Sequence, residues 1–358
     1  MRCYQKKEGL ILKINLLNLF LIILALLSCS REEEWKSVEL PDTSREIRLR
    51  VASVANPRFA QLNNQQIQEI LNKSAVMIKQ HFGLSVVFEE PESVSIEKLF
   101  EVLPEKVKQE RQKEIVKFGA VNDTDIIKMR AGVYEVLSKY WDDRQAVVDY
   151  ARPYLLTPVK DNDFKQLSVA LVDTLLKRLE YWRTQKAEDG RPVIDSRPYN
   201  EWVWWDSLGY GDLPYDIIIT NQLVASAEMY GMSVHSSIRG GITAGTTTYS
   251  KQARYGSYVY VMVYPMLNDL AMLVELRNDK SYSSDQVTTY AAALLTHEIG
   301  HQLLHLGHPF GNPKCIMSPT PLLKYREWLA GLDAAGCPLN SEASMTPGFA
   351  SIDYRTDW

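Results

Sequence analysis

The residues whose types and spacing could carry out a reaction lie between His297 and His308, where four of the six histidines of this 358-residue chain occur. Histidines four residues apart lie about 40° apart around an α-helix, so His297 and His301 can bind one metal ion. Glu298 follows the first of them and can take a proton from a zinc-bound water, then return it to a leaving amine. The pattern indicates zinc-dependent hydrolysis of peptide bonds, with one Zn²⁺ per chain.

A catalytic zinc ion needs a third protein ligand. No Glu stands on a well-placed helix nearby, but two histidines do follow the pair. His305 continues the same helical face one turn past His301. His308 follows Gly307, which can end the helix in a left-handed turn and bring the next side chain back toward the metal. We favour His308 as the third ligand and keep His305 as the alternative.

Downstream of the histidines the chain reads Cys315-Ile316-Met317-Ser318-Pro319. Together with His-Glu-x-x-His, this segment resembles the metzincin clan of zinc metallopeptidases, in which the third ligand is followed by a Met-turn. The position of Cys315, two residues before Met317, resembles the corresponding turn of the archaemetzincin branch. The resemblance covers about residues 47–90 and 215–335. It implies that Met317 lies in the core beneath the site and is not a ligand.

The sequence departs from the clan at several positions. Leu304 and Gly307 stand where the clan has its Gly and its third His, and one inserted residue that delays the helix break would explain both. Pro309 replaces an archaemetzincin Cys, so a second, structural zinc ion is not expected. Pro319 stands where the clan sometimes places a Tyr that stabilises the oxyanion, which leaves that helper unidentified.

The elements that would position these residues follow from hydrophobic spacing. Residues 47–54, a helix over 64–82 that stops at Gly83, and a strand over 84–88 form a parallel βαβ unit. Further strands are expected over 215–220, 238–250 and 257–263, followed by a helix over 284–306 and another over 321–334. The resemblance implies an α+β, zincin-like fold: a mixed five-stranded sheet with an active-site helix, interrupted by a large helical insertion.

The resemblance also implies where a substrate would bind. In such folds an extended peptide adds antiparallel to the edge strand of the sheet. We therefore expect a peptide or protein substrate to lie along the Gly- and Thr-rich edge strand, at residues Gly241, Ile242, Thr243 and Ala244.

Two parts of the chain are assigned to the zincin-like catalytic domain, 47–92 and 206–358. Between them, 93–205 reads as a helical and aromatic insertion. Residues 93–186 predict three or four helices with apolar stripes that pack on the rest of the fold. The aromatic residues of 188–214 fit a small core under a long loop, or alternatively a sugar- or peptide-binding surface.

The N-terminus indicates export. Residues 1–28 combine a basic flank, a short apolar run and small residues before a break, which is typical of a signal peptide. Leu26-Leu27-Ser28-Cys29 resembles a bacterial lipobox, which implies lipid attachment at Cys29 and a tether over 29–46. Ser30 then favours the outer membrane of a Gram-negative cell. A soluble secreted protein is the alternative.

The remaining cysteines and the net charge bear on the disulfides and the partners that we expect. Cys315 and Cys337 are the two thiols left in the mature chain, and in an oxidising compartment we expect a disulfide between them, with free thiols as the alternative. The formal net charge of −4 gives no electrostatic reason to expect nucleic acid as a partner. We expect a monomer.

Two other functions fit the same residues. The chain could be a catalytically inactive, zincin-like surface lipoprotein that acts as a binding module, its activity lost through the altered spacing of the third ligand. Alternatively the zinc could be structural. The intact His297, Glu298 and His301 favour the enzyme over both.

Overall fold

The computed structural model describes residues 42, 45–115, 121–140, 144–160, 163–194, 197–225, 234–279, 281–309 and 312–337. The predicted signal peptide 1–28, Cys29 and nearly all of the tether 29–46 lie outside these residues, so those predictions remain untested. No helix in the described ranges is long and apolar enough to cross a membrane.

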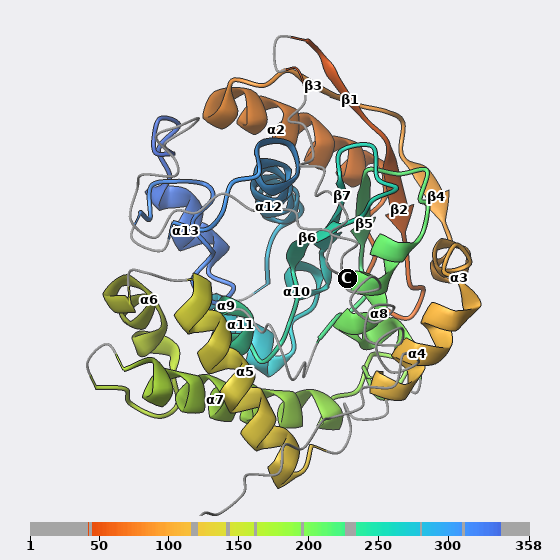
Figure 1. The fold of residues 1–358 in the computed structure, drawn as a ribbon. Coiled ribbons are helices and arrows are strands. Elements are labelled where there is room, and N and C mark those ends of the chain that lie inside the picture. The colour runs from red at the N-terminus through yellow and green to blue at the C-terminus, as the bar shows by residue number, and fades with distance from the viewer. Residues whose placement is uncertain are drawn as a thin grey trace, which may run out of the picture. The chain divides into compact units, whose positions relative to one another are not determined.

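The described residues form a mixed α and β fold around a five-stranded sheet with the order β4-β2-β5-β7-β6 (Figure 1). The strands are β1 Ile47–Leu49, β2 Val51–Val54, β3 Val86–Phe88, β4 Glu92–Val94, β5 Ile217–Thr220, β6 Gly245–Tyr249 and β7 Ser257–Met262. The α-helices are α2 Asn64–Phe82, α3 Ile96–Phe100, α4 Glu105–Ile115, α5 Asp123–Tyr140, α6 Arg144–Ala151, α7 Phe164–Thr184, α8 Trp202–Asp206, α9 Val234–Ile238, α10 Tyr264–Leu267, α11 Ala271–Arg277, α12 Ser284–Leu304 and α13 Tyr325–Gly331. The order of the strands confirms the expected mixed five-stranded sheet.

Four strands of the main sheet run parallel, and β6 pairs antiparallel with β7 at one edge. Alternate residues of a strand point to opposite faces, and here both faces are covered. Ile217 and Ile219 of β5 join the larger core, while Ile218 joins a second core on the other face. This double burial explains why β5 and β7 read as continuous apolar runs.

The expected strand 47–54 is divided in two at Arg50. β1 pairs with β3 in a separate two-stranded sheet, while β2 pairs with β4 and β5 in the main sheet. The cause is the carboxylate of Asp216, which accepts hydrogen bonds from the Arg50 backbone N–H at 2.8 Å and from its guanidinium at 2.8 and 3.1 Å. An N–H held by a side chain cannot continue a strand ladder, so the pairing changes there.

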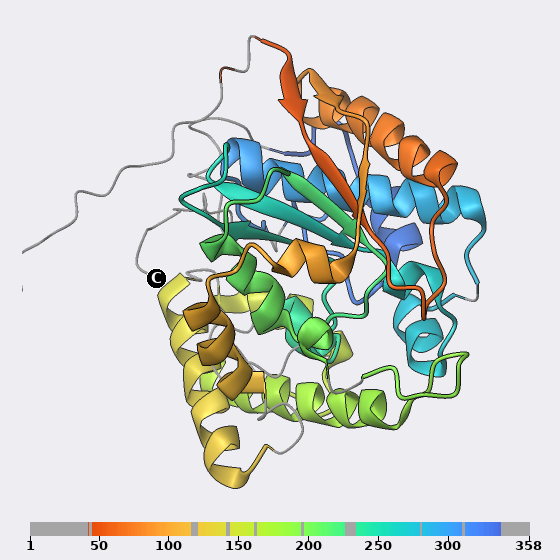
Figure 2. The ribbon, with the colours of Figure 1, turned by 90° about the vertical axis from the view of Figure 1, so that its right-hand side faces the viewer.

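Helices α2 and α12 lie side by side along one face of the sheet (Figure 2). The predicted boundaries of α2 are confirmed: Asn63 and Gln66 form a capping box, and Gly83 ends the helix in a left-handed conformation. The buried Ser74 hydroxyl lies 3.1 Å from the backbone oxygen of Ala292 in α12. α2 therefore supports the helix that carries the predicted ligands.

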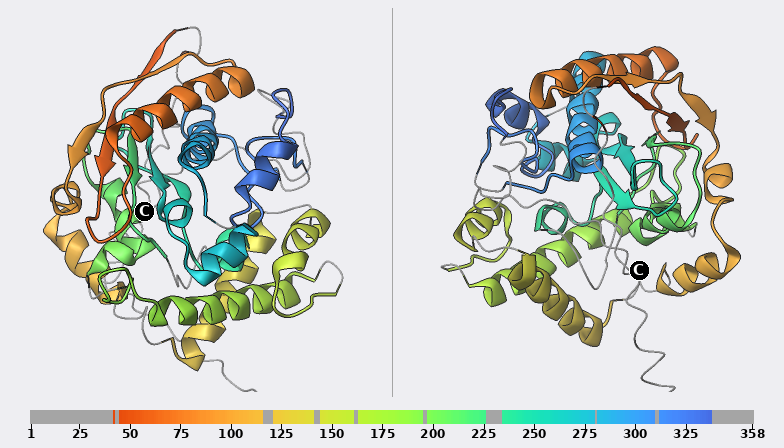
Figure 3. Two further views of the ribbon diagram at one scale, coloured as in Figure 1. Left: turned by 180° about the vertical axis from the view of Figure 1, so that it is seen from behind. Right: turned by 45° about the horizontal axis from the view of Figure 1, so that its top comes forward.

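The region 93–186 is helical as predicted, with more and shorter helices. In its described residues, α3 to α7 form, and α5 packs on α7 (Figure 3). The predicted stripe Leu167, Leu171, Leu175 and Leu179 is fully buried. The strand β4 was not predicted. It crosses the expected boundary at residue 92 and joins the sheet.

Aromatic residues after 188 form a small core, which was one of the two predictions for this segment; the other was a sugar- or peptide-binding surface. Trp205 is fully buried and Trp204 nearly so, both within the second core. Phe100 of α3 contacts both rings at centroid distances of 5.2 and 5.7 Å. The part of the chain assigned to the insertion therefore covers one face of the sheet.

We predict that Asp216→Asn lowers the free energy of unfolding by about 3 kcal/mol, because it breaks the ion pair with Arg50. The Asp216 carboxylate of that pair is buried, and it also sets the point at which the strand pairing changes. The measurement is the free energy of unfolding in urea. Arg48→Ala, which breaks the exposed pair with Glu46, serves as the control and is expected to cost less than about 1 kcal/mol. Equal losses in the two variants would contradict the prediction.

Candidate metal centre

The helix α12 carries three of the candidate residues into the interior. Ser283 and Gln286 form a capping box at its start, which confirms the predicted N-terminus near Ser284. The helix is buried on all sides over most of its length, from Val287 to Leu303. Consequently His297, Glu298 and His301 are only 3–5% exposed.

Three imidazoles converge at one point. The Nε2 atoms of His297 and His301 lie 3.1 Å apart, and the Nε2 atom of His308 lies 3.1 and 3.0 Å from them. In the described part of the chain these three form the cluster of His, Cys, Asp or Glu side chains able to hold a metal ion. The prediction that His308 joins the pair is confirmed, and His305 lies outside the cluster.

The hydrogen bonds of the rings show that the cluster suits a cation. Nδ1 of His297 lies 2.8 Å from the backbone oxygen of Ile316, and Nδ1 of His301 contacts that of Leu306. A carbonyl accepts only, so each Nδ1 carries the hydrogen and each Nε2 presents a lone pair to the other. Two lone pairs at this separation repel each other, and a metal ion between them would remove the repulsion.

Burial keeps these histidines neutral. Desolvation lowers the pKa of His297 to about 3, helped by the neighbouring His301, and lowers that of His301 to about 4. At neutral pH both rings are therefore uncharged, which is the form that binds metals. The sequence predicted the ligands, while their charge state follows from the depth at which α12 lies.

The residue that makes the turn at the end of α12 is not the one predicted. The helix ends at Leu304, and His305 adopts the left-handed conformation with φ of 53°. The Leu306 N–H then donates to the Gly300 carbonyl at 3.2 Å, so a carbonyl of the last turn of the helix keeps a partner. The expected turn at Gly307 is wrong, because Gly307 is not among the described residues with positive φ. His305 makes the turn that returns His308 to the cluster.

The loop after the histidines lies beneath the site, as the Met-turn resemblance implies. Ile316 supplies the carbonyl that orients His297, and Met317 is fully buried. A Cβ at Gly300 would stand 2.3 Å from the Met317 sulfur. A larger residue at this position of α12 would therefore require the buried Met317 and Phe82 side chains to shift.

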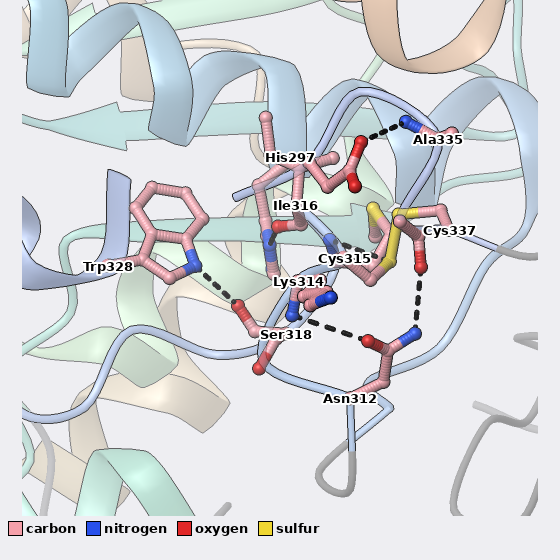
Figure 4. The surroundings of a disulfide bond; sticks show 12 residues. His297, Asn312, Lys314, Cys315, Ile316, Ser318, Trp328, Ala335 and Cys337 are labelled. Carbon is pink, nitrogen blue, oxygen red and sulfur yellow. Dashed lines mark hydrogen bonds between the residues drawn. A yellow bond between two sulfur atoms is a disulfide. The ribbon is translucent and has the colours of Figure 1, made fainter. Parts of the chain in front are cut away.

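Two further contacts hold that loop. Cys315 and Cys337 form the predicted disulfide, and the Trp328 indole N–H donates to the Ser318 backbone oxygen at 3.0 Å (Figure 4). The Trp328 ring also meets the His297 ring edge-on, with centroids 6.1 Å apart. Trp328 belongs to α13, which is shorter than the predicted helix over 321–334 but packs behind the site as expected.

Glu298 lies beside the cluster and against the edge strand. Its Oε2 accepts a hydrogen bond of 2.9 Å from the Thr247 hydroxyl. Burial raises the pKa of Glu298 to about 8, while the Thr247 hydrogen bond and the charge of Arg239 act in the opposite direction. A cation held by the histidines would favour the carboxylate further. Glu298 is thus a buried acid–base group next to a metal position.

The predicted edge strand over 238–250 is shorter in the structure, and the four residues expected to line the substrate come before it. Gly241, Ile242, Thr243 and Ala244 are buried and precede the edge strand, which begins at Gly245. Gly240 and Gly241 both have positive φ, so the chain turns there and cannot yet be extended. The edge strand itself exists, and it runs next to α12 over Gly245–Tyr249.

Sequence reasoning missed two residues near the site, Thr247 and Arg239. Thr247 stands in a run of three threonines, and only the strand register shows which of them faces Glu298. Arg239 is 4% exposed and follows α9, and its charge also lowers the pKa of His297. No sequence signal distinguishes this arginine from the others.

Comparison of the chain with models of protein families, with curated proteins and with solved structures finds no match. The site is therefore interpreted from its own geometry.

We predict that His308→Ala abolishes stoichiometric metal binding, since two imidazoles alone hold a metal weakly. The measurement is metal content after dialysis against a weak chelator. His305→Asn serves as the control, because Asn tolerates the left-handed conformation required there. It is expected to retain the metal. Loss of metal from both variants, or from His305→Asn alone, would contradict the assignment of ligands.

Proposed function

We propose that this protein is a zinc-dependent peptidase that hydrolyses peptide bonds outside the cytoplasm. The observation that carries the proposal is the convergence of His297, His301 and His308 within 3.1 Å, with Glu298, buried and bonded to Thr247, adjacent in sequence to the first of them. Imidazole ligands suit zinc, and a glutamate adjacent in sequence to the first ligand suits general base catalysis.

Each residue has a defined role in this proposal. The three histidines would hold one zinc ion, which when bound supplies a Lewis acid that polarises the scissile carbonyl and makes the attacking water more acidic. Glu298 removes the proton of that water and later delivers it to the amine nitrogen that leaves. Met317 and Gly300 keep the ligand helix and the loop beneath it in close contact.

The number of ligands favours catalysis over a structural zinc site. Structural zinc sites are closed by four protein ligands, whereas catalytic sites have three and an open position. In the described residues three histidines converge and no fourth Cys, His, Asp or Glu joins them. A purely structural site would also give no reason to bury Glu298, since burial of a carboxyl group is unfavourable.

We propose that the substrate peptide adds to β6, the antiparallel edge strand at Gly245–Tyr249. β6 pairs with β7 on one side, and among the described strands none pairs with its other side. An extended peptide could bond to that edge at Gly245 and Thr247, since Gly209 lies against the Tyr249 carbonyl. A mixed sheet, an antiparallel edge strand, a ligand helix and a loop with a buried Met are the elements that the metzincin resemblance implies.

Glu298→Gln is predicted to retain about one zinc per chain and to lower peptide hydrolysis at least about 100-fold, because the amide cannot accept the proton of the water. The measurement is cleavage of a mixture of proteome-derived peptides, followed by mass spectrometry. Glu110→Gln, at an exposed position of α4, is the control and is expected to behave as wild type. Undiminished hydrolysis by Glu298→Gln would disprove the mechanism. Equal inactivity of all three proteins would support the binding-module alternative.

We propose that Cys29 anchors the mature chain in a membrane through lipid, with the outer membrane of a Gram-negative cell as the expected location. Labelled palmitate fed to expressing cells should enter the wild-type protein. The Cys29→Ala variant should remain unlabelled and leave the membrane fraction, because the thiol that carries the lipid is gone. Equal labelling of the two proteins would contradict the anchor.

A further inference from the structure

The inner face of the edge strand β6 contacts the proposed catalytic glutamate at two positions. Alternate residues of a strand point to the same face, so Gly245 and Thr247 face α12 together. The register supports this, since Thr247 pairs with Val259 of the larger core, whereas Thr246 pairs with Tyr260 of the second core. One short strand thus presents a glycine and a hydroxyl to Glu298.

Gly245 leaves room for one carboxyl oxygen. A Cβ at this position would stand 2.6 Å from Oε1 of Glu298 and 2.8 Å from the Leu294 side chain. Both distances are too short for real contacts. The carboxyl group is therefore packed directly against the strand backbone at Gly245, and it cannot move further in that direction.

Thr247 holds the other oxygen. Its hydroxyl lies 2.9 Å from Oε2 of Glu298 and 3.2 Å from the backbone oxygen of the same residue. The hydroxyl has one hydrogen and two lone pairs, so it donates to one of these oxygens at a time and can still accept a hydrogen bond.

We propose that Thr247 is the residue that positions Glu298 for catalysis and supports its carboxyl group both before and after proton uptake. This inference rests on the proposed peptidase function. Thr247 does not exchange a proton with the substrate, and it acts through Glu298.

The two acceptors explain how one hydroxyl serves both stages. While Glu298 is a carboxylate, Thr247 donates to Oε2. Once the carboxyl group has taken the proton of the water onto Oε2, that O–H donates to Thr247, and the threonine turns its own hydrogen to the Glu298 backbone oxygen. If the proton is instead on Oε1, the original bond persists. In every case the Glu298 side chain keeps a hydrogen-bond partner in Thr247 and with it its orientation.

The test compares Thr247→Val, Thr247→Ser and Thr124→Val. Valine has the shape of threonine without the hydroxyl, and serine restores the hydroxyl. Thr124 is the matched control, because the same change is made there at an exposed position of α5 outside the proposed site. Zinc content, thermal stability, kcat and KM are measured for each variant, using a peptide cleaved by the wild type.

We expect Thr247→Val to keep its zinc and its stability and to lose about 10- to 100-fold in kcat with little change in KM, as a misplaced catalytic group does. Thr247→Ser should recover most of the rate, and Thr124→Val should equal the wild type. As a second perturbation, Gly245→Ala should lower kcat by displacing the carboxyl group from the other side.

The outcomes separate the two proposals. If the wild type hydrolyses peptides but Thr247→Val matches Thr124→Val, the positioning role is wrong and the peptidase function stands. A change confined to KM, or a failure of serine to rescue, would likewise overturn the role. If the wild type hydrolyses no peptide, the proposed function fails, and the role of Thr247 fails with it.

Discussion

The backbone carbonyls of Ile316 and Leu306 accept hydrogen bonds from Nδ1 of His297 and His301. These two bonds fix which nitrogen of each ring carries the hydrogen, and they leave both Nε2 lone pairs facing one position. His308 adds its Nε2 at the same place. Neutral, buried rings arranged in this way are suited to a metal ion and to little else, so the chemistry of the site depends on where two carbonyl oxygens lie.

Most of the surrounding structure serves to place those carbonyls. The Leu306 carbonyl lies just beyond the left-handed turn at His305, where α12 ends. The Ile316 carbonyl belongs to a loop held by the Cys315–Cys337 disulfide and packed on Gly300 through Met317. The sheet and α2 support α12 from behind, and the Thr247 hydroxyl of β6 holds the Glu298 carboxyl group.

Local patterns predicted the parts of the site that depend on local structure. The histidine spacing on a helix, the buried Met317 and the cysteine pair could all be inferred from residue types. His308 was also predicted, although for the wrong reason, since His305 and not Gly307 turns the chain. A non-glycine residue in this conformation is stabilised by the tertiary contacts of Leu306, which no local signal shows. Likewise the strand break at Arg50 depends on Asp216, 166 residues away.

The central claim is that three imidazoles bind one zinc ion, and X-ray absorption at the zinc edge tests it most directly. The account predicts one zinc per chain, with about three imidazole nitrogens and one further light ligand at about 2.0–2.1 Å. Sulfur at about 2.3 Å, a shell without imidazole scattering, or no stoichiometric zinc in the purified protein would contradict it.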